Sequence, residues 1–466
     1  MVDGNGEPRV RLTKRVRHAL GREARALVQP GPPSLELMLP VGPQVPDDAQ
    51  VQQALDLCMR TGEVLLSSGE SASDTTNAMI ELANACGLPM VDVDITFTSI
   101  TMCCHRGMAA SPVTSMRLVR RRSLDLTRQA AVRDIMARVA RGALDVRGAA
   151  TELDVAVRSR HPYPRWVATA GWAGLAAGIA LMLGAAPSTA MAAFVVTGAV
   201  DRTGRLLSRW GVPSFFQQVV GGALATGAAI GLFATGLFPA GTRPSLVVAA
   251  GITVLLSGLS VVGTVQDAIA GYYVTAAGRA AEIALLSAGL LTGVVLALKV
   301  GAEFGLLLTV TGEVPAAGGR YWSGIGGAAV AAAGFALAGY AQWRPLLMAA
   351  LAGAAGWATY GLMTQFATIG PVAATGAAAI VVGGVAGLLR RGTAVQPLVV
   401  VLAGITPLLP GFVAYRGFYE LAVEGVADGL VTVTVALAIG LALAAGASFG
   451  EFLTAPHHTG TPARAQ

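Results

Sequence analysis

The sequence predicts a polytopic α-helical membrane protein of about ten spans, arranged as two inverted five-helix repeats behind a small α+β cytoplasmic domain. Three observations predict this class: the composition, a series of long apolar runs, and an internal repeat. Hydrophobic residues make up 54% of the 466 residues and charged residues only 13%, whereas soluble domains carry roughly 25% charged residues. Charged residues are frequent up to Arg165 and sparse afterwards.

Residues 1–47 are expected to form a basic arm followed by a proline-rich linker. The stretch Arg9–Arg25 fits either a helix lying on anionic lipid or a disordered arm. The net charge of +6 is explained more simply by the positive-inside bias of a membrane protein than by nucleic-acid binding. No nucleic acid is therefore expected as a partner.

Residues 48–160 are expected to form the cytoplasmic α+β domain. The second helix of this domain should be capped by Ser73 or Asp74 and should end at Gly87, and the last should be capped by Asp145. Alternating hydrophobic and polar residues from Val91 to Thr98 predict a strand with one wet face. The remaining predicted elements are helices over 51–66, 124–140 and 146–158 and a strand over 113–119.

The predicted domain carries no signature of an enzyme or of a metal site. Cys103 and Cys104 are adjacent on a strand and point to opposite faces, so one ion could hardly use both thiolates. Reduced structural cysteines are the better interpretation. The chain has no phosphate-binding loop for ATP and no nucleophile elbow. We therefore expect no cofactor, no metal and no enzymatic activity.

Apolar runs follow from Trp166 onward, each about 17 to 22 residues long and therefore long enough to cross ~30 Å of hydrocarbon. The first membrane half is expected over residues 166–300, the second over 321–450, and a disordered cytoplasmic tail over 451–466. The second run is interrupted by Asp201 and Arg202 and could instead be re-entrant. The ten runs are Trp166–Leu183, Thr189–Leu207, Phe215–Phe238, Ser245–Val262, Ala280–Lys299, Trp322–Tyr340, Leu346–Gln365, Ile369–Leu389, Ala394–Leu409 and Gly429–Phe449.

An internal repeat relates the two halves. The segment Gly251–Gly258 recurs as Gly404–Gly411, an offset of 153 positions (404 − 251), in the fourth run of each half. An odd number of spans per half places the halves in opposite orientations, which is the plan of many secondary transporters. Gly174-xxx-Gly178 is adequately explained by close helix packing in lipid.

The repeated segment is expected to break its helix in both halves. Proline lacks the amide hydrogen that a helix interior needs, so Pro407 and Pro410 should interrupt the ninth span. Ser257 and Gly258 are the softer counterparts in the fourth span, and Gly411 follows the second break. Interrupted helices near the midplane are where such transporters bind solutes.

Arginine is more frequent in the loops that this topology places inside, which predicts cytoplasmic N- and C-termini in the inner (plasma) membrane. The inside loops hold Arg202, Arg205, Arg209, Arg279, Arg344, Arg390 and Arg391. The outside loops hold Arg243, Arg320 and Arg416, with Lys299 at a boundary.

Ionisable and aromatic residues lie just beyond both predicted breaks, and ionisable groups at membrane depth are functional candidates. Solvated loops and interfacial aromatic belts are the alternative explanation. Arg279 and Glu282 are three apart and should be able to pair on one helix face. The pathway candidates are Gln266, Asp267, Tyr272, Tyr273, Arg279 and Glu282 in the first half, and Arg416 and Glu420 in the second.

The chain resembles the threonine/serine exporter family over nearly its whole length after the linker. The segments that carry the resemblance are Gly62–Ser71, Gly87-Leu88, Val91–Thr101, Leu124–Leu126, Val261–Thr275, Arg279 with Glu282, and Leu408–Gly417. The resemblance implies a ten-span exporter of threonine or serine, driven by the proton motive force, with a cytoplasmic N-terminal domain. One branch of that family exports dicarboxylates such as succinate.

The expected function is export of a small polar metabolite, with protons and the lipid bilayer as further partners and a homo-oligomer left open. The alternatives are a dicarboxylate exporter, and a membrane-anchored sensor or hydrolase that acts through residues 48–160. The repeat and the broken helices favour a transporter, because an anchor needs only one or two spans. Asp267 is the expected coupling carboxylate, and capping of the following helix is its alternative role.

Overall fold

The computed structural model describes residues 48–88, 90–106, 111–119, 124–236, 244–255, 258–306, 321–365, 367–389, 397–423 and 426–454. The expected basic arm and proline-rich linker lie outside the described residues, as do residues 455–466 of the expected C-terminal tail, whereas residues 451–454 of that tail are helical. Arg243, Arg320, Arg390, Arg391 and Ser257 also lie outside the described residues.

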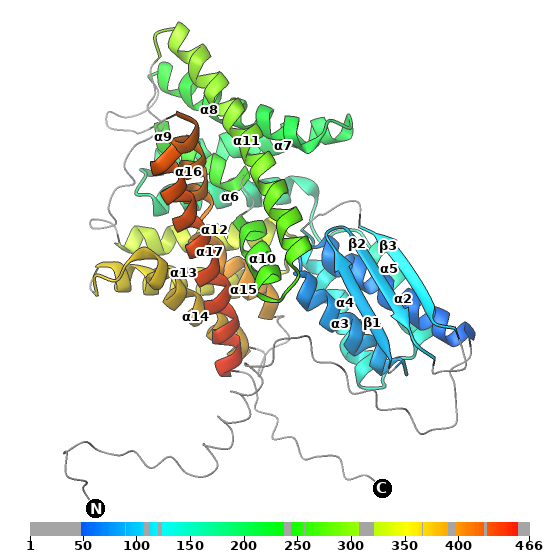
Figure 1. The fold of residues 1–466 in the computed structure, drawn as a ribbon. Coiled ribbons are helices and arrows are strands. Elements are labelled where there is room, and N and C mark those ends of the chain that lie inside the picture. Colours follow the sequence, from blue (N-terminus) through cyan, green and yellow to red (C-terminus); the bar gives the residue numbers. More distant parts are fainter. Residues whose placement is uncertain are drawn as a thin grey trace, which may run out of the picture. The chain divides into compact units, whose positions relative to one another are not determined.

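The first elements form an α+β segment, Asp48–Arg158, with its own hydrophobic core. Ser71 rather than Ser73 or Asp74 caps the second helix, because its hydroxyl accepts from the amide of Asp74. Asp145 caps the last helix of the segment, Val146–Arg158, as predicted. The elements are α2 (Asp48–Ser67), α3 (Ala72–Ala85), β1 (Val91–Thr96), β2 (Ser99–Cys104), β3 (Val113–Leu118), α4 (Leu126–Ala140) and α5 (Val146–Arg158) (Figure 1).

The three strands form one antiparallel sheet in the order β1-β2-β3. β2 was not predicted as a separate strand, because the two-residue turn at Phe97 and Thr98 lacks the usual glycine or asparagine; Phe97 adopts a positive φ of 54°. The buried side chains of Ile95, Ile100 and Met102 lie on the face that packs against α2 and α3. Cys104 shares this face, and Cys103 lies on the other face as predicted.

The rest of the described chain is helical. Within the described residues, each of the ten predicted apolar runs falls on a helix; the fourth run extends into a second α-helix, and the ninth ends just after a 3₁₀ turn. The helices are α6 (Arg165–Met182), α7 (Pro187–Arg209), α8 (Ser214–Ala234), α9 (Pro244–Leu255), α10 (Gly258–Ile269), α11 (Tyr273–Glu303), α12 (Tyr321–Ala338), α13 (Trp343–Gln365), α14 (Pro371–Leu389), α15 (Pro397–Ile405), the 3₁₀ turn η2 (Thr406–Leu408), α16 (Gly411–Val423) and α17 (Val426–Thr454).

Within the described residues, six helices are long and apolar enough to cross a bilayer, or seven if the bent pair α9–α10 is one span. The two members of that pair meet at 45°. α7 continues through Asp201, whose carboxylate accepts from the Thr169 hydroxyl at 2.7 Å and pairs with Arg205 at 3.0 Å. The protein is therefore polytopic and helical.

The repeat offset carries residues of one helix to residues of its counterpart around the two breaks. A shift of 153 positions carries Pro244 of α9 to Pro397 of α15 (397 − 244) and Gly258 of α10 to Gly411 of α16 (411 − 258). The same shift carries Tyr273 of α11 to Val426 of α17 (426 − 273).

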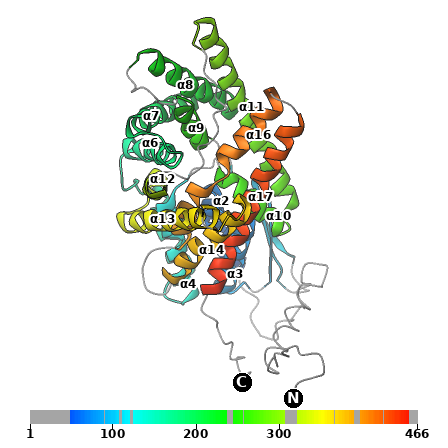
Figure 2. The same cartoon turned by 90° about the vertical axis from the view of Figure 1, so that its left-hand side faces the viewer.

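The helix contacts also correspond between the halves. α6 packs on α7, α8 on α11 and α10 on α11, just as α12 packs on α13, α14 on α17 and α16 on α17. α10 also packs on α17 and α11 on α16, which brings the four helices together (Figure 2).

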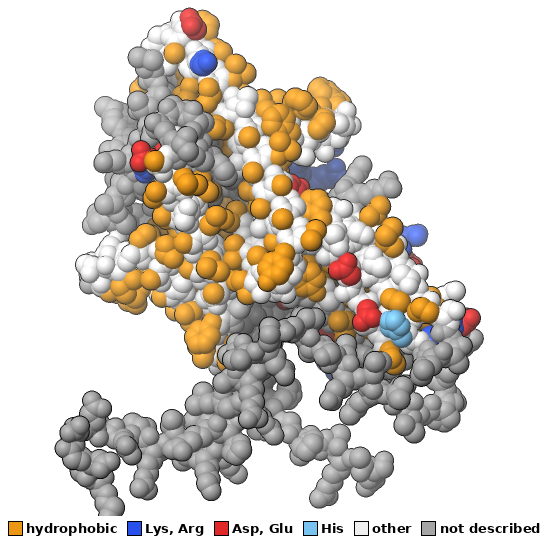
Figure 3. Space-filling model, viewed as in Figure 1, with side chains coloured by type: hydrophobic (Ala, Val, Ile, Leu, Met, Phe, Trp, Pro, Cys, Tyr) orange, Lys and Arg blue, Asp and Glu red, His pale blue; other side chains and the backbone are white. Residues whose placement is uncertain are grey.

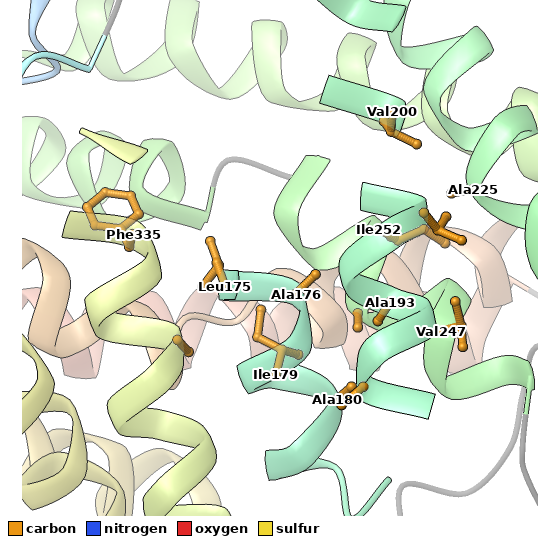
Figure 4. Packing of buried hydrophobic residues seen from close by; sticks show 14 of the residues in the cluster. Leu175, Ala176, Ile179, Ala180, Ala193, Val200, Ala225, Val247, Ile252 and Phe335 are labelled. Atoms are coloured by element: carbon orange, nitrogen blue, oxygen red, sulfur yellow. The ribbon is translucent and has the colours of Figure 1, made fainter. Parts of the chain in front are cut away.

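Glycines allow α6 and α12 to touch through their backbones. A Cβ atom at Gly171 would lie 2.8 Å from the carbonyl oxygen of Gly334, and one at Gly178 would lie 2.6 Å from that of Gly327. From Gly171 to Gly178 along α6, the contacting residue of α12 changes from Gly334 back to Gly327. The two helices are therefore antiparallel. Leu175 and Phe335 extend this interface into the apolar core shown in Figure 4.

The long helices carry large exposed hydrophobic side chains. Leu285 of α11 is 58% exposed and Leu437 of α17 is 52% exposed. Figure 3 shows hydrophobic side chains spread over these helices with few charged groups among them. Such a surface suits lipid rather than water, because soluble proteins rarely expose large apolar patches.

Candidate functional site

A buried ion pair joins the two helices that follow the first break. Asp267, in the last turn of α10, is 0% exposed, and its Oδ2 lies 2.7 Å from Nη1 of Arg279 on α11. Gly271, at a φ of +89°, lets the chain reverse between the helices. The amide of Tyr272 closes this turn on the carbonyl of Asp267 at 2.8 Å, as in a glycine-terminated helix end.

The same carboxylate also contacts the α+β segment. The backbone amide of Ala72, the first residue of α3, donates to Oδ1 of Asp267 at 2.8 Å. Nη2 of Arg279 donates to the backbone carbonyl of Glu70 at 3.3 Å. Asp267 therefore lies at the positive end of the α3 helix dipole, where a negative charge is stabilised.

Glu70 brings a second buried carboxylate to this region. It is 4% exposed and forms an ion pair with Arg133 of α4. Burial raises the pKa of the Glu70 carboxyl, while the Arg133 guanidinium and the Gln129 amide oppose that rise. Gly69 positions Glu70, because its φ of +97° ends α2 and turns the chain toward α3. Together Glu70, Arg133, Asp267 and Arg279 form what we call the junction cluster.

The hairpin of the α+β segment docks next to this cluster. The hydroxyl of Thr275, on α11, donates to the carbonyl of Ile95 at 2.9 Å and accepts from the amide of Phe97 at 3.0 Å. A Cβ atom at Gly278 would lie 3.0 Å from the Phe97 ring. Glycine at this position therefore lets the hairpin approach α11 closely.

The α+β segment also contacts the second half. The amide of Leu126 donates to the carbonyl of Gly339 at 2.9 Å, and the Thr127 hydroxyl donates to that of Tyr340 at 2.5 Å. The His161 ring stacks on the Tyr340 ring with centroids 4.1 Å apart. The segment thus contacts the α10–α11 corner of one half and the α12–α13 corner of the other.

The charged candidates of the second half also lie together. Nε of Arg416 donates to Oε1 of Glu420 at 2.6 Å, and the hydroxyl of Thr432 donates to Oε2 of the same carboxylate. Glu420 is 4% exposed, and these two donors offset part of the cost of burying its carboxylate.

The remaining candidates are more peripheral. Gln266 is half-buried, Tyr272 is half-buried against the core of the α+β segment, Tyr273 is 72% exposed and the Glu282 side chain is exposed. Gly258 lies in α10 and Gly411 begins α16, the helices after the two breaks. Pro407 and Pro410 are buried.

Sequence reasoning missed Glu70, Arg133, Thr275 and Thr432. The contact between Ala72 and Asp267 joins positions 195 residues apart, which periodicity cannot reveal. Thr432 was detectable, because it lies 153 positions (432 − 279) after Arg279.

Comparison with known proteins gives family matches over both parts of the chain. Residues 56–301 match the family described as "Putative threonine/serine exporter", and residues 325–453 match "Threonine/Serine exporter, ThrE". No solved structure matches the chain.

Two curated relatives match most of the chain. A protein of Mycobacterium tuberculosis named "Probable threonine/serine exporter" is 38% identical over 418 residues, covering 88% of this chain and 78% of the relative. The "Threonine/serine exporter" of Corynebacterium glutamicum is 35% identical over 410 residues, covering 87% and 83%. The matched regions contain both broken helices and the junction cluster, and the chain belongs to the threonine/serine exporter family.

Proposed function

We propose that this protein is a secondary transporter that exports threonine and serine across the plasma membrane, driven by the proton motive force. The relatives named as threonine/serine exporters support the solute. The structural observation that carries the transport mechanism is the pair of broken helices with the same spacing in both halves.

The proposed architecture has ten spans in two inverted repeats. The constant spacing of 153 positions and the matching helix contacts support the repeat. The antiparallel crossing of α6 and α12, the first helix of each half, supports the inversion, because equivalent helices of parallel repeats would share one direction. In this arrangement the chain ends and the α+β segment are cytoplasmic.

The solute site is proposed beside the first break. The side-chain amide of Gln218 donates to the carbonyl of Leu255 at 3.3 Å, where α9 ends. The hydroxyls of Thr197 and Thr226 are buried and have no hydrogen-bond partner among the described residues. A buried polar group without a partner is costly, so a polar solute that bonds these hydroxyls would be favoured there.

Asp267 is proposed as the carboxylate that couples transport to protons. In the described state it is held by Arg279 and by the amide of Ala72. Protonation removes the charge that attracts both partners, so the contact with α3 weakens. A proton that binds and leaves once per cycle would then alternate between two arrangements of the α10–α11 corner.

The α+β segment is proposed to gate the cytoplasmic side without covalent chemistry. It contacts corners of both halves through Asp267 on one side and Gly339 on the other. If the halves rock against each other, at least one of these contacts has to open in each cycle.

Efflux measurements test the proposal. Cells that overproduce the protein are loaded with peptides that yield threonine or serine, or with succinate as the competing dicarboxylate, and release is followed with and without an uncoupler. Faster release of threonine and serine that the uncoupler abolishes is the expected result; faster release of succinate alone would refute the solute assignment.

Topology reporters test the architecture separately. A reporter at Gln466 is expected inside and one at Ala317 outside. A cytoplasmic Ala317 would contradict the inverted repeat and leave the solute assignment standing.

A further inference from the structure

The repeat offset relates the two charged clusters residue by residue. A shift of 153 positions carries Asp267 to Glu420 (420 − 267) and Arg279 to Thr432 (432 − 279). Both carboxylates lie on the helix that follows a break, α10 or α16, and both partners lie on the next helix, α11 or α17. The positions are equivalent in the fold as well as in the sequence.

Equivalent bonds are formed in the two halves. Asp267 is paired with Arg279, and Glu420 accepts from the hydroxyl of Thr432. Both carboxylates are buried, at 0% and 4% exposure. A buried carboxylate is unfavourable without a cation or several donors, so each site needs positive charge nearby.

The arginine that supplies this charge comes from non-equivalent helices in the two halves. In the first half it is Arg279 on α11, the helix after the one that carries the acid. In the second half it is Arg416 on α16, one turn before Glu420. Its equivalent in the first half, 153 positions earlier (416 − 153), is Gly263 on α10. A Cβ atom at Gly263 would lie 3.2 Å from Nη1 of Arg279, so the guanidinium of Arg279 lies against the place where a side chain at 263 would begin.

In each half, one buried acid is thus paired with one arginine. The position that holds arginine in the other half holds a smaller residue: Gly263 in the first half and Thr432 in the second. A surface i,i+4 pair would explain Arg416 and Glu420 alone. It would not explain the burial of Glu420, the bond from Thr432 or the complementary glycine in the first half. Both halves therefore keep an acid–arginine pair, but the helix that contributes the arginine differs between them.

We infer that Arg416, Glu420 and Thr432 form a second acid–arginine site, equivalent to Asp267 with Arg279, and that the transport cycle requires both sites. This inference rests on the proposed function. The two sites also differ in their contact with the α+β segment: α3 covers Asp267 through the amide of Ala72, whereas Arg416 and Thr432, which donate to Glu420, belong to α16 and α17. In an inverted repeat the second site would lie toward the opposite side of the membrane.

Transplanting the arginine tests the equivalence. Arg279→Thr alone leaves Asp267 without its cation and is expected to lower threonine efflux by about 100-fold or more. Gly263→Arg combined with Arg279→Thr rebuilds in the first half the arrangement of the second. The double variant is expected to recover efflux to within about tenfold of the wild type, which is about 1.4 kcal/mol in activation free energy.

The measurements use the full-length protein in proteoliposomes loaded with radiolabelled threonine, with an imposed pH gradient. Threonine–threonine exchange without a gradient is measured in parallel, together with the amount of protein inserted. Gly263→Arg alone is the control for tolerance of the larger side chain. Glu420→Gln is the second arm, expected to abolish gradient-driven efflux while exchange persists.

The outcomes separate this inference from the proposed function. A wild type that moves no threonine refutes the proposed function. A wild type that exports, with an inserted double variant no more active than Arg279→Thr, overturns the equivalence of the sites. If the double variant does not insert, Glu420→Gln decides: normal gradient-driven efflux overturns the inference, and its selective loss supports it.

Discussion

Removing the charge of Asp267 is expected to affect stability and transport in separable ways. The side chain is fully buried, pairs with Arg279 at 2.7 Å and accepts from Ala72 at 2.8 Å. Removing one partner of a buried ion pair costs about 3–5 kcal/mol, because the other charge is left buried. Asp267→Asn keeps an acceptor for the Ala72 amide, so Asp267→Ala should cost about 1 kcal/mol more.

A double variant isolates the ion pair. Asp267→Asn with Arg279→Gln removes both charges and leaves two neutral groups able to bond to each other. Its loss of stability is expected to be smaller than the sum of the single losses by about 2–3 kcal/mol, in the range of direct contacts. Reversible unfolding by SDS in mixed micelles, followed by tryptophan fluorescence, measures these differences.

Transport should not recover with stability. Both Asp267→Asn and the double variant are expected to lose gradient-driven efflux, because no group at position 267 can then exchange a proton, while threonine exchange persists. Wild-type gradient-driven efflux by Asp267→Asn would refute the coupling role and leave Asp267 as a cap of α3. If the double variant lost as much free energy of unfolding as the two single variants together, the proposed interaction energy of the ion pair would be refuted.

Three further perturbations have defined outcomes. Gly293→Leu should prevent accumulation of folded protein, because even a Cβ atom would clash with the Val219 carbonyl oxygen, whereas Gly227→Leu, with nothing within 4 Å, should be tolerated; immunoblots of membranes compare the two. The pKa of Glu70 is raised above 4.5 by burial, so its ionisation destabilises the fold as pH rises from 4.5 through that raised pKa; Glu70→Gln should flatten this decline in melting temperature. Pro410→Ala should reduce efflux more than insertion if the break exposes carbonyls to the solute, and equal losses of both would indicate a packing role only.

The apolar runs were predictable because span length follows from the thickness of hydrocarbon. The break after α15 was predictable because proline has a fixed backbone consequence, and the first break was predictable because the internal repeat places Ser257 and Gly258 at the equivalent positions. The helices after the breaks, α10 and α16, were harder to predict. Each carries a carboxylate, Asp267 or Glu420, among apolar residues. A hydropathy window that penalises charged residues therefore ends the predicted span before the helix does.

The partner of Asp267 could not be predicted by local spacing. The pairing of Arg279 with Glu282 on its own helix was expected from their spacing and stays a prediction, but the contact of Arg279 with Asp267 across the turn at Gly271 was not foreseen. That contact depends on a chain reversal and on α3, which comes from 195 positions earlier. Burial of a charge is decided by these tertiary contacts, which residue spacing does not encode.

The backbone contact of α6 with α12 has a consequence for biosynthesis. Gly171 and Gly327 are separated by 156 positions (327 − 171), and a ribosome adds about 5–20 residues per second, so α6 leaves the ribosome roughly 8–30 s before its partner. During that interval the glycine face of α6 has no α12 to cover it and is open to other small-residue helices. Wrong pairing of α6 during synthesis is therefore expected to limit how much of this protein a cell can accumulate, in addition to the stability of the finished fold.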